Sequence, residues 1–148
     1  MTSMNPRVAE QETGQGGVMR SVGAVFLGFV AVVALSLGTD EILHVLEVYP
    51  PWGQPMPQPR LNLLALVYRD AFAVMGGVLA ARFAPRAAMR HAVILGIVGT
   101  LIGTIGAIAT IPLHLGPAWY PIALAVSALP CSWFGGLLWR RTRNAANS

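Results

Sequence analysis

The chain has 148 residues, of which 55% are hydrophobic and 11% are charged, and its mean hydropathy is +0.60. This balance excludes an ordinary soluble domain and predicts a membrane protein. The formal net charge is +4, but the arginines flank apolar runs and do not gather with aromatic residues on a polar face. We therefore expect no nucleic-acid partner.

All ten basic residues are arginines, and the sequence contains no lysine. Together with the abundance of alanine, glycine and proline, this bias is typical of a GC-rich bacterial genome. Cys131 is the only cysteine, which excludes an internal disulfide and a cysteine-based metal site. Because Cys131 lies inside an apolar run, we interpret it as a small packing residue.

The first 20 residues are polar and show no periodicity, so they predict a disordered cytoplasmic tail over residues 1–20. The apolar run that starts at Ser21 is too long for a cleaved signal peptide and predicts a signal anchor. It is the first of four apolar runs, each near the roughly 20 residues that cross a bilayer. The runs cover residues 22–48, 61–81, 91–111 and 119–139.

Backbone groups in lipid must form hydrogen bonds within their own segment, so the four runs predict transmembrane helices. The predicted fold class is all-α, an integral membrane four-helix bundle over residues 21–141 with the lipid bilayer as its partner. Only Arg60 flanks the runs on one side, so the positive-inside rule predicts that both termini are cytoplasmic (N-in, C-in). Residues 142–148 are then a second cytoplasmic tail, and we expect the bacterial inner membrane as the location. The arginines of the cytoplasmic side are Arg7, Arg20, Arg82, Arg86, Arg90, Arg140, Arg141 and Arg143.

Ionisable side chains interrupt two of the runs, at the end of the first and near the middle of the second. Charged residues at such depth cost at least ~2.5 kcal/mol each, so they face the bundle interior and have partners. We call this set the polar cluster. Its members are Asp40, Glu41, His44, Glu47, Tyr68, Arg69 and Asp70.

Helical geometry narrows the pairing within the polar cluster. At 1.5 Å per residue, Arg69 lies about 10 Å deeper than Asp40. A long arginine side chain and some helix tilt can cover this gap. We therefore predict that Arg69 pairs with Asp40 or Glu41. Asp70 points about 100° away from Arg69, so it finds another partner or stays protonated.

A second interpretation of the first run stays open. The helix can end at Gly38, with Thr39 or Asp40 capping a short amphipathic helix on the outer surface. The remaining span, residues 22–37, is a little short to cross a bilayer. In this interpretation the acidic face is solvated, and only Arg69 and Asp70 need partners.

Small residues predict how the helices pack. The third run carries a glycine face, and the fourth carries a ridge of small residues every four positions, which we expect to match it. The glycine face either packs within the bundle or forms a homo-oligomer. Pro130 removes a backbone hydrogen bond and predicts a kink in the fourth helix. The glycine face is Gly96, Gly99, Gly103 and Gly106, and the ridge is Ala123, Ser127, Cys131 and Gly135.

A metal site is one alternative for the polar cluster. Glu41 and His44 have the i, i+3 spacing of carboxylate-bridged sites in helical bundles, and Asp70 and His114 can add ligands. Such sites normally use two Glu-x-x-His motifs, and this chain has one. We therefore expect no cofactor and keep the metal site as an alternative.

Three functional classes follow from these features. The leading hypothesis is an accessory or structural membrane protein whose polar cluster fixes the helices. The second is a small-solute or proton transporter or channel, which requires an oligomer because four short helices leave one protomer little room. The third is a lipid-phase membrane enzyme with His44 as base, but no nucleophile, oxyanion arrangement or phosphate loop accompanies it, so we lean against an enzyme.

Several short motifs are spread over most of the chain beyond residue 20. They are Thr39-Asp40 followed by Leu43-His44, Pro50-Pro51-Trp52-Gly53, Tyr68-Arg69 followed by Gly76-Gly77, Met89-Arg90-His91-Ala92 and Pro117-Ala118-Trp119-Tyr120-Pro121. In these motifs the chain resembles small four-helix bacterial inner-membrane proteins without an assigned function. The resemblance implies the fold and the location, and it implies no activity, cofactor or catalytic residue.

Overall fold

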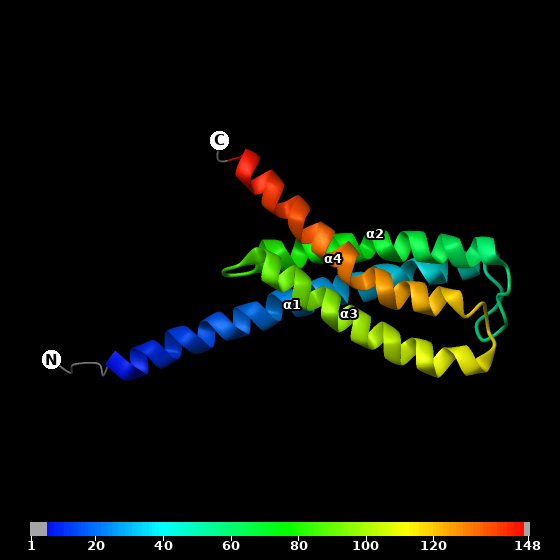
Figure 1. The fold of residues 1–148 in the computed structure, drawn as a ribbon, viewed down its shortest axis with the longest axis horizontal. Helices are drawn as coiled ribbons and strands as arrows, with labels where there is room; N and C mark the ends of the chain where they lie inside the picture. Colours follow the sequence, from blue (N-terminus) through cyan, green and yellow to red (C-terminus); the bar gives the residue numbers. More distant parts are fainter. Residues whose placement is uncertain (1–5, 147–148) are drawn as a thin grey trace.

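Four long helices make up the computed structural model, which describes residues 6–146 and, of these, the side chains of residues 16–146. They are α1 (Pro6–Val45), α2 (Pro59–Phe83), α3 (Ala88–Thr110) and α4 (Trp119–Ala145), with a short 3-10 helix, η1 (Ile111–Leu113), after α3. The helices run back and forth along the long axis (Figure 1), and residues 6–146 contain no strand. The predicted all-α class is confirmed. Four spans of 25 to 30 residues are long and apolar enough to cross a membrane, one for each long helix, and the third includes η1 as well as α3.

Prolines mark most of the helix boundaries. Pro59 occupies the first turn of α2, where its missing backbone N–H is not needed. Pro112 follows α3 and tightens the chain into η1, because proline cannot continue the hydrogen-bond ladder. Only residues 84–87 join α2 to α3, and both chain termini lie at that end of the molecule, opposite the two longer connections (Figure 1).

α1 differs from the sequence expectation at both ends. It is continuous through Gly38 to Val45, so the alternative of a break at Gly38 is wrong. It also begins at Pro6, where a disordered tail was expected over residues 1–20; residues 1–5 lie outside the described part. Proline at the first helical position and the helix formers that follow it account for this start. At the other end of the chain, α4 continues to Ala145, into the segment 142–148 expected as a tail.

α2 lies at the centre of the bundle and contacts all three other long helices. Glycines allow these approaches. A Cβ built on Gly76 would lie 3.0 Å from the carbonyl oxygen of Gly28 in α1, and one on Gly77 would collide with the backbone of Ser132 in α4. Most buried apolar residues of the described chain are alanines. Close backbone approach between small residues therefore holds the helices together, as in membrane bundles.

The glycine face of α3 packs mostly within the bundle. Cβ atoms built on Gly96, Gly99 and Gly103 would lie 2.8, 3.2 and 3.0 Å from atoms of α4, whereas nothing lies within 4 Å of one on Gly106. The packing of α3 on α4 therefore uses three of these four glycines.

The small-residue ridge predicted on α4 faces α2, and the expectation that it matches the glycine face of α3 is wrong. Ser127 donates a hydrogen bond to Asp70 of α2, and Cys131 lies beside the same carboxyl group. A Cβ on Gly135 would collide with the carbonyl of Val74, and Ala123 is half-buried. α4 lies between two helices and carries small residues toward both, so a four-residue spacing does not say which neighbour a ridge meets. The residues of α4 that meet the glycine face or its neighbours on α3 are Ala125, Ala128, Leu129, Ser132 and Gly136.

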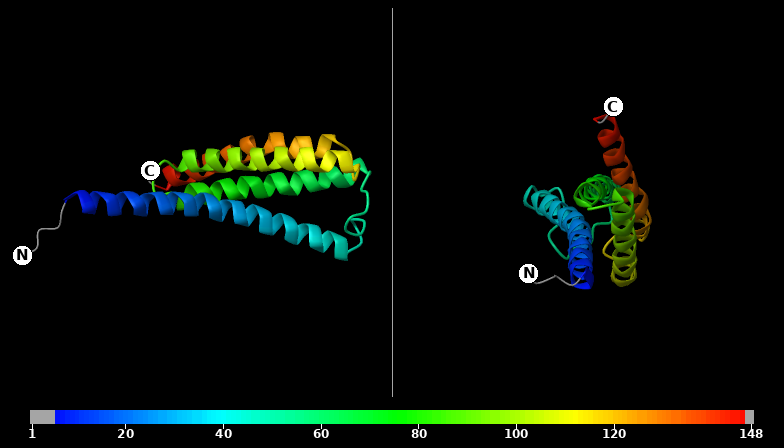
Figure 2. Two further views of the ribbon diagram at one scale, coloured as in Figure 1. Left: turned by 90° about the horizontal axis from the view of Figure 1, so that it is seen from below. Right: turned by 90° about the vertical axis from the view of Figure 1, so that its left-hand side faces the viewer.

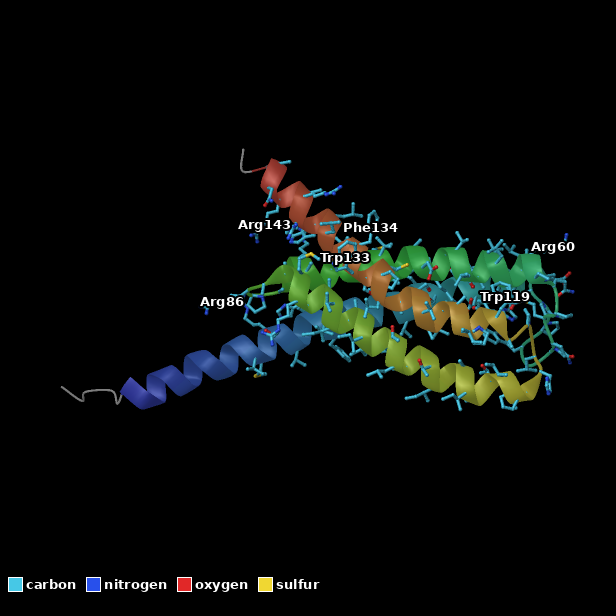
Figure 3. All side chains as sticks on the ribbon, in the orientation of Figure 1. Arg60, Arg86, Trp119, Trp133, Phe134 and Arg143 are labelled. Atoms are coloured by element: carbon cyan, nitrogen blue, oxygen red, sulfur yellow. The ribbon has the colours of Figure 1, made fainter. Side chains whose placement is uncertain are left out.

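The outer surface is apolar. Phe26, Ile105 and Val126 are 64%, 67% and 69% exposed, and side chains project from all four helices into the surroundings (Figure 3). Polar groups show the opposite pattern, since Asp40 and Asn62 are 4% and 2% exposed. This distribution is the reverse of that of a water-soluble protein and fits helices that are surrounded by lipid.

Candidate functional site

A cavity of about 310 Å³ lies at the end of the molecule where residues 46–58 join α1 to α2 and residues 111–118 join α3 to α4. Figure 2 shows that the C-terminal end of α1 diverges from the other helices here, with the long connection reaching across to α2. We call it the end cavity. Its lining includes Asp40, His44, Trp52, Asn62, Arg69 and Tyr120.

The carboxylate of Asp40 is the centre of the polar contacts in the end cavity. Arg69 forms an ion pair with one of its oxygens, and the hydroxyl of Tyr68 donates to the other. Both partners lie on α2, so these contacts join α1 to α2. The side chain of Asp40 is 6% exposed, and a charge buried to this degree requires such partners. Arg69 thus pairs with one of the two acids that the sequence offered.

Arg69 keeps unused hydrogen-bonding capacity. Its side chain is 30% exposed and lines the end cavity. The Nε atom is buried and has no hydrogen-bond partner among the described residues. A guanidinium carries five N–H donors, and buried donors without a partner are rare in folded proteins. Burial keeps Nε away from the cavity. The exposed part of the guanidinium, which forms one hydrogen bond to Asp40, lines the cavity with N–H donors that have no acceptor among the described residues.

Tyr49 folds the chain after α1 back onto α2. The backbone N–H groups of Val48 and Tyr49 both donate to the carbonyl of Leu43, at 2.9 and 3.0 Å. This turn places Glu47 in the left-handed region with φ of 57°, so Glu47 lies exposed in the turn and outside the cavity lining. Burial raises the pKa of Tyr49 above its usual value near 10, which keeps its hydroxyl protonated as a donor.

Hydrogen bonds extend from Tyr49, which lines the end cavity, to α2. Its hydroxyl donates to the carbonyl of Leu61 at 3.3 Å and lies 3.5 Å from the hydroxyl of Tyr68, which in turn contacts Asp40. The loop after α1, the first half of α2 and the end of α1 are therefore joined through one set of polar contacts.

His44 and Glu41 hold the proline-rich connection in place. The Nδ1 of His44 donates to the backbone carbonyl of Asp40 at 2.7 Å, and its ring stacks on Trp52 with ring centroids 4.0 Å apart. The indole N–H of Trp52 donates to Glu41 at 3.2 Å. These two members of the polar cluster therefore position one aromatic wall of the cavity.

Asn62 ties the two loops of this end together. Its amide donates to the carbonyls of Met56 and Gln58, at 2.8 and 2.9 Å. The N–H of Met56 donates to the carbonyl of Leu115 in the second loop, at 2.6 Å. An amide in the apolar start of α2 is a signal that sequence reasoning could have used, because buried amides need partners. Trp52 and Tyr120, which the predicted polar cluster does not include, also line the cavity.

Asp70 does not belong to the end cavity. Its carboxyl group accepts a hydrogen bond from Ser127 of α4 at 2.6 Å, and it is not part of the cavity lining. The predicted polar cluster therefore divides into a group around Asp40 and a separate contact between α2 and α4. The sequence analysis expected Asp70 either to find a partner other than Arg69 or to stay protonated, and in the structure Ser127 is that partner.

The candidate metal ligands are not brought together. Among the described residues, no group of three or more His, Cys, Asp or Glu side chains is placed to hold a metal ion. Glu41 contacts Trp52, and Asp70 contacts Ser127 on another helix pair. His114 is exposed in the turn after η1, with φ of 51°. The metal alternative gains no support from this arrangement.

The lining of the end cavity is suited to binding. Thr110 is its one aliphatic hydroxyl, and it donates to the carbonyl of Gly106 at 2.8 Å. His44 is occupied by Asp40 and Trp52, so no nucleophile and base are paired there. No family model, curated protein or solved structure matches the chain. The geometry of the end cavity therefore carries the functional argument.

Proposed function

We propose that the protein is a small multi-pass protein of the bacterial inner membrane that binds a small molecule in the end cavity, in an accessory rather than a catalytic role. Both termini are cytoplasmic in this proposal, and the cavity faces outward. The chain is then one of the small four-helix inner-membrane proteins that its motifs resemble.

The arginine distribution supports this orientation. Arg86 and Arg143 lie at the end with the termini, and Arg60 and Trp119 lie at the opposite end (Figure 3). Arginine-rich ends favour the cytoplasmic side. A C-terminal fusion to green fluorescent protein should therefore fluoresce and a C-terminal fusion to alkaline phosphatase should be inactive. An active phosphatase fusion would reverse the orientation.

The observation that carries the binding proposal is the buried ion pair of Asp40 and Arg69 at the floor of an open cavity. Its volume, about 310 Å³, lies at the lower end of the range for small-molecule sites. A few polar groups surrounded by aromatic and proline side chains are also typical of such sites. A purely structural ion pair would need no cavity above it.

Packing in the other half favours binding over conduction. Cβ atoms on Gly77 and Gly135 would collide with the backbone of the facing helix, so α2 and α4 leave no room for a passage between them there. A protomer that is open at its outer end and closed between α2 and α4 in its inner half is suited to hold a solute. The transporter hypothesis gains no support from this packing.

A blocking variant tests the binding proposal. Ala118 is exposed and lines the cavity, so Ala118→Trp should fill the cavity at little cost to folding. Ile122, which is 50% exposed and outside the lining, provides the matched control Ile122→Trp. We expect ligand-observed NMR with a mixed fragment library to detect binders to wild-type protein in nanodiscs and to Ile122→Trp that Ala118→Trp does not bind. Identical binding profiles for all three proteins would refute the proposal.

A further inference from the structure

The end cavity contains donors without acceptors. Among residues 16–146, the guanidinium of Arg69 forms one hydrogen bond, to Asp40, and its side chain is 30% exposed and lines the cavity. Tyr120 lines the same cavity, and no described group forms a hydrogen bond with its hydroxyl. Each oxygen of Asp40 already has a partner, Arg69 or Tyr68. The missing partner is therefore an oxygen acceptor.

The charges around the end cavity favour a ligand whose hydrogen-bond acceptor is neutral. Asp40 already neutralises Arg69, and at the same end Glu41 and Glu47 face only Arg60 as a further cation. With the histidines neutral, these five side chains sum to a charge of −1. An anion would thus enter a site whose cation is already paired, and would lose its hydration without gaining a new counter-charge.

The side chains that line the end cavity favour a ligand with a flat, apolar ring system. Trp52 stacks on His44 with an interplanar angle of 1°, which presents a rigid planar aromatic wall. Pro51, Ile111 and Pro117 line other parts of the cavity and offer no hydrogen-bond donor from their side chains. Rigid aromatic and proline surfaces favour ring-shaped ligands because little side-chain entropy is lost on contact.

From these features we propose that the end cavity binds a neutral ring compound through a carbonyl oxygen, which accepts hydrogen bonds from the Arg69 guanidinium and the Tyr120 hydroxyl. Aryl ketones and quinone head groups belong to this class. The inference rests on the proposed binding function and adds the chemical class of the ligand.

Three naphthalene probes with the same ring system separate the alternatives. 2-Acetylnaphthalene carries the carbonyl, 2-ethylnaphthalene has no acceptor, and 2-naphthoate is an anion. We expect 2-acetylnaphthalene to bind wild-type protein in nanodiscs roughly tenfold more tightly than either of the others, as two hydrogen bonds imply. Isothermal titration calorimetry, corrected with empty nanodiscs, measures the dissociation constants.

Conservative variants then test the two donors. Tyr120→Phe removes only the hydroxyl, and it should weaken 2-acetylnaphthalene about three- to tenfold while leaving 2-ethylnaphthalene unchanged. Arg69→Lys keeps a cation opposite Asp40 but removes the guanidinium N–H groups that line the cavity, and it should have the same selective effect. Trp119→Phe, next to Tyr120 but outside the cavity lining, is the matched control and should bind all probes as wild type does. Melting temperature monitors folding, and Tyr120→Phe alone decides if Arg69→Lys does not fold.

The possible outcomes are distinct. Equal affinity for 2-acetylnaphthalene and 2-ethylnaphthalene would overturn the acceptor assignment, and tighter binding of 2-naphthoate would make the cavity an anion site. Equal losses for both neutral probes in Tyr120→Phe would overturn the role of the hydroxyl. If no naphthalene binds but the blocking variant still changes the fragment profile, the ligand class is wrong and the binding proposal stands. If the fragment profile is also unchanged, both fail.

Discussion

The two ends of the bundle are held together in opposite ways. At the end with the termini, glycines bring helix backbones into direct contact, as where Gly77 meets Ser132. At the other end, side chains with hydrogen bonds and an ion pair span the wider separation of α1 from the rest, and a cavity remains between them. Packing suffices where helix backbones touch, whereas at the other end polar contacts span the gap between α1 and α2. The comparison teaches that the open end can bind a ligand because the closed end supplies the rigidity.

The largest expected effect is at the open end, on removal of the cation. Arg69→Ala leaves Asp40, whose side chain is 6% exposed, without a counter-charge. Breaking a buried pair in this way costs about 3–5 kcal/mol. SDS titration in mixed micelles measures the free energy of unfolding of each variant. Arg60→Ala, which removes an arginine outside any ion pair among the described residues, is the control, and equal stability of the two variants would contradict the account.

A smaller loss is expected at the closed end. Gly77→Ala places a methyl group against the Ser132 carbonyl, and such overpacking costs about 1–3 kcal/mol. Gly106→Ala is the matched control, because nothing lies within 4 Å of its Cβ and alanine is the better helix former. The same SDS titration compares them. If Gly77→Ala proves as stable as Gly106→Ala, then backbone contact does not hold this end.

Part of the fold and part of the end cavity could be predicted from the sequence. The apolar runs and the need to compensate Arg69 are local facts, so the helices and an acid partner from α1 could be predicted. The continuity of α1 through Gly38 could not be predicted, because glycine occurs both inside helices and at their C-terminal ends. The cavity could not be predicted either, since it depends on how loops carrying Trp52 and Asn62 fold over the helix ends.

The smallest expected effect is a gain in stability at the turn that closes the open end. Glu47 adopts φ of 57°, a conformation that costs non-glycine residues roughly 1–2 kcal/mol. Glu47→Gly should therefore stabilise the protein by up to about 1 kcal/mol, because the greater entropy of glycine in the unfolded chain offsets part of the relief. Glu47→Ala keeps the backbone strain and tests the loss of the carboxylate. Thermal unfolding in detergent compares the two variants, and we expect the higher melting temperature for Glu47→Gly. A lower melting temperature for Glu47→Gly than for Glu47→Ala would contradict the left-handed conformation of Glu47 in this turn.

The coupling between Asp40 and Arg69 tests the central claim most directly. A double-mutant cycle with Asp40→Asn, Arg69→Gln and the double variant, measured as free energies of unfolding by SDS titration, isolates their interaction. Because the two side chains form an ion pair across α1 and α2, we predict a coupling energy above about 1 kcal/mol, with the double variant more stable than the sum of the single losses implies. Losses that add to within about 0.5 kcal/mol would mean that Asp40 and Arg69 do not form the pair on which the end cavity is built.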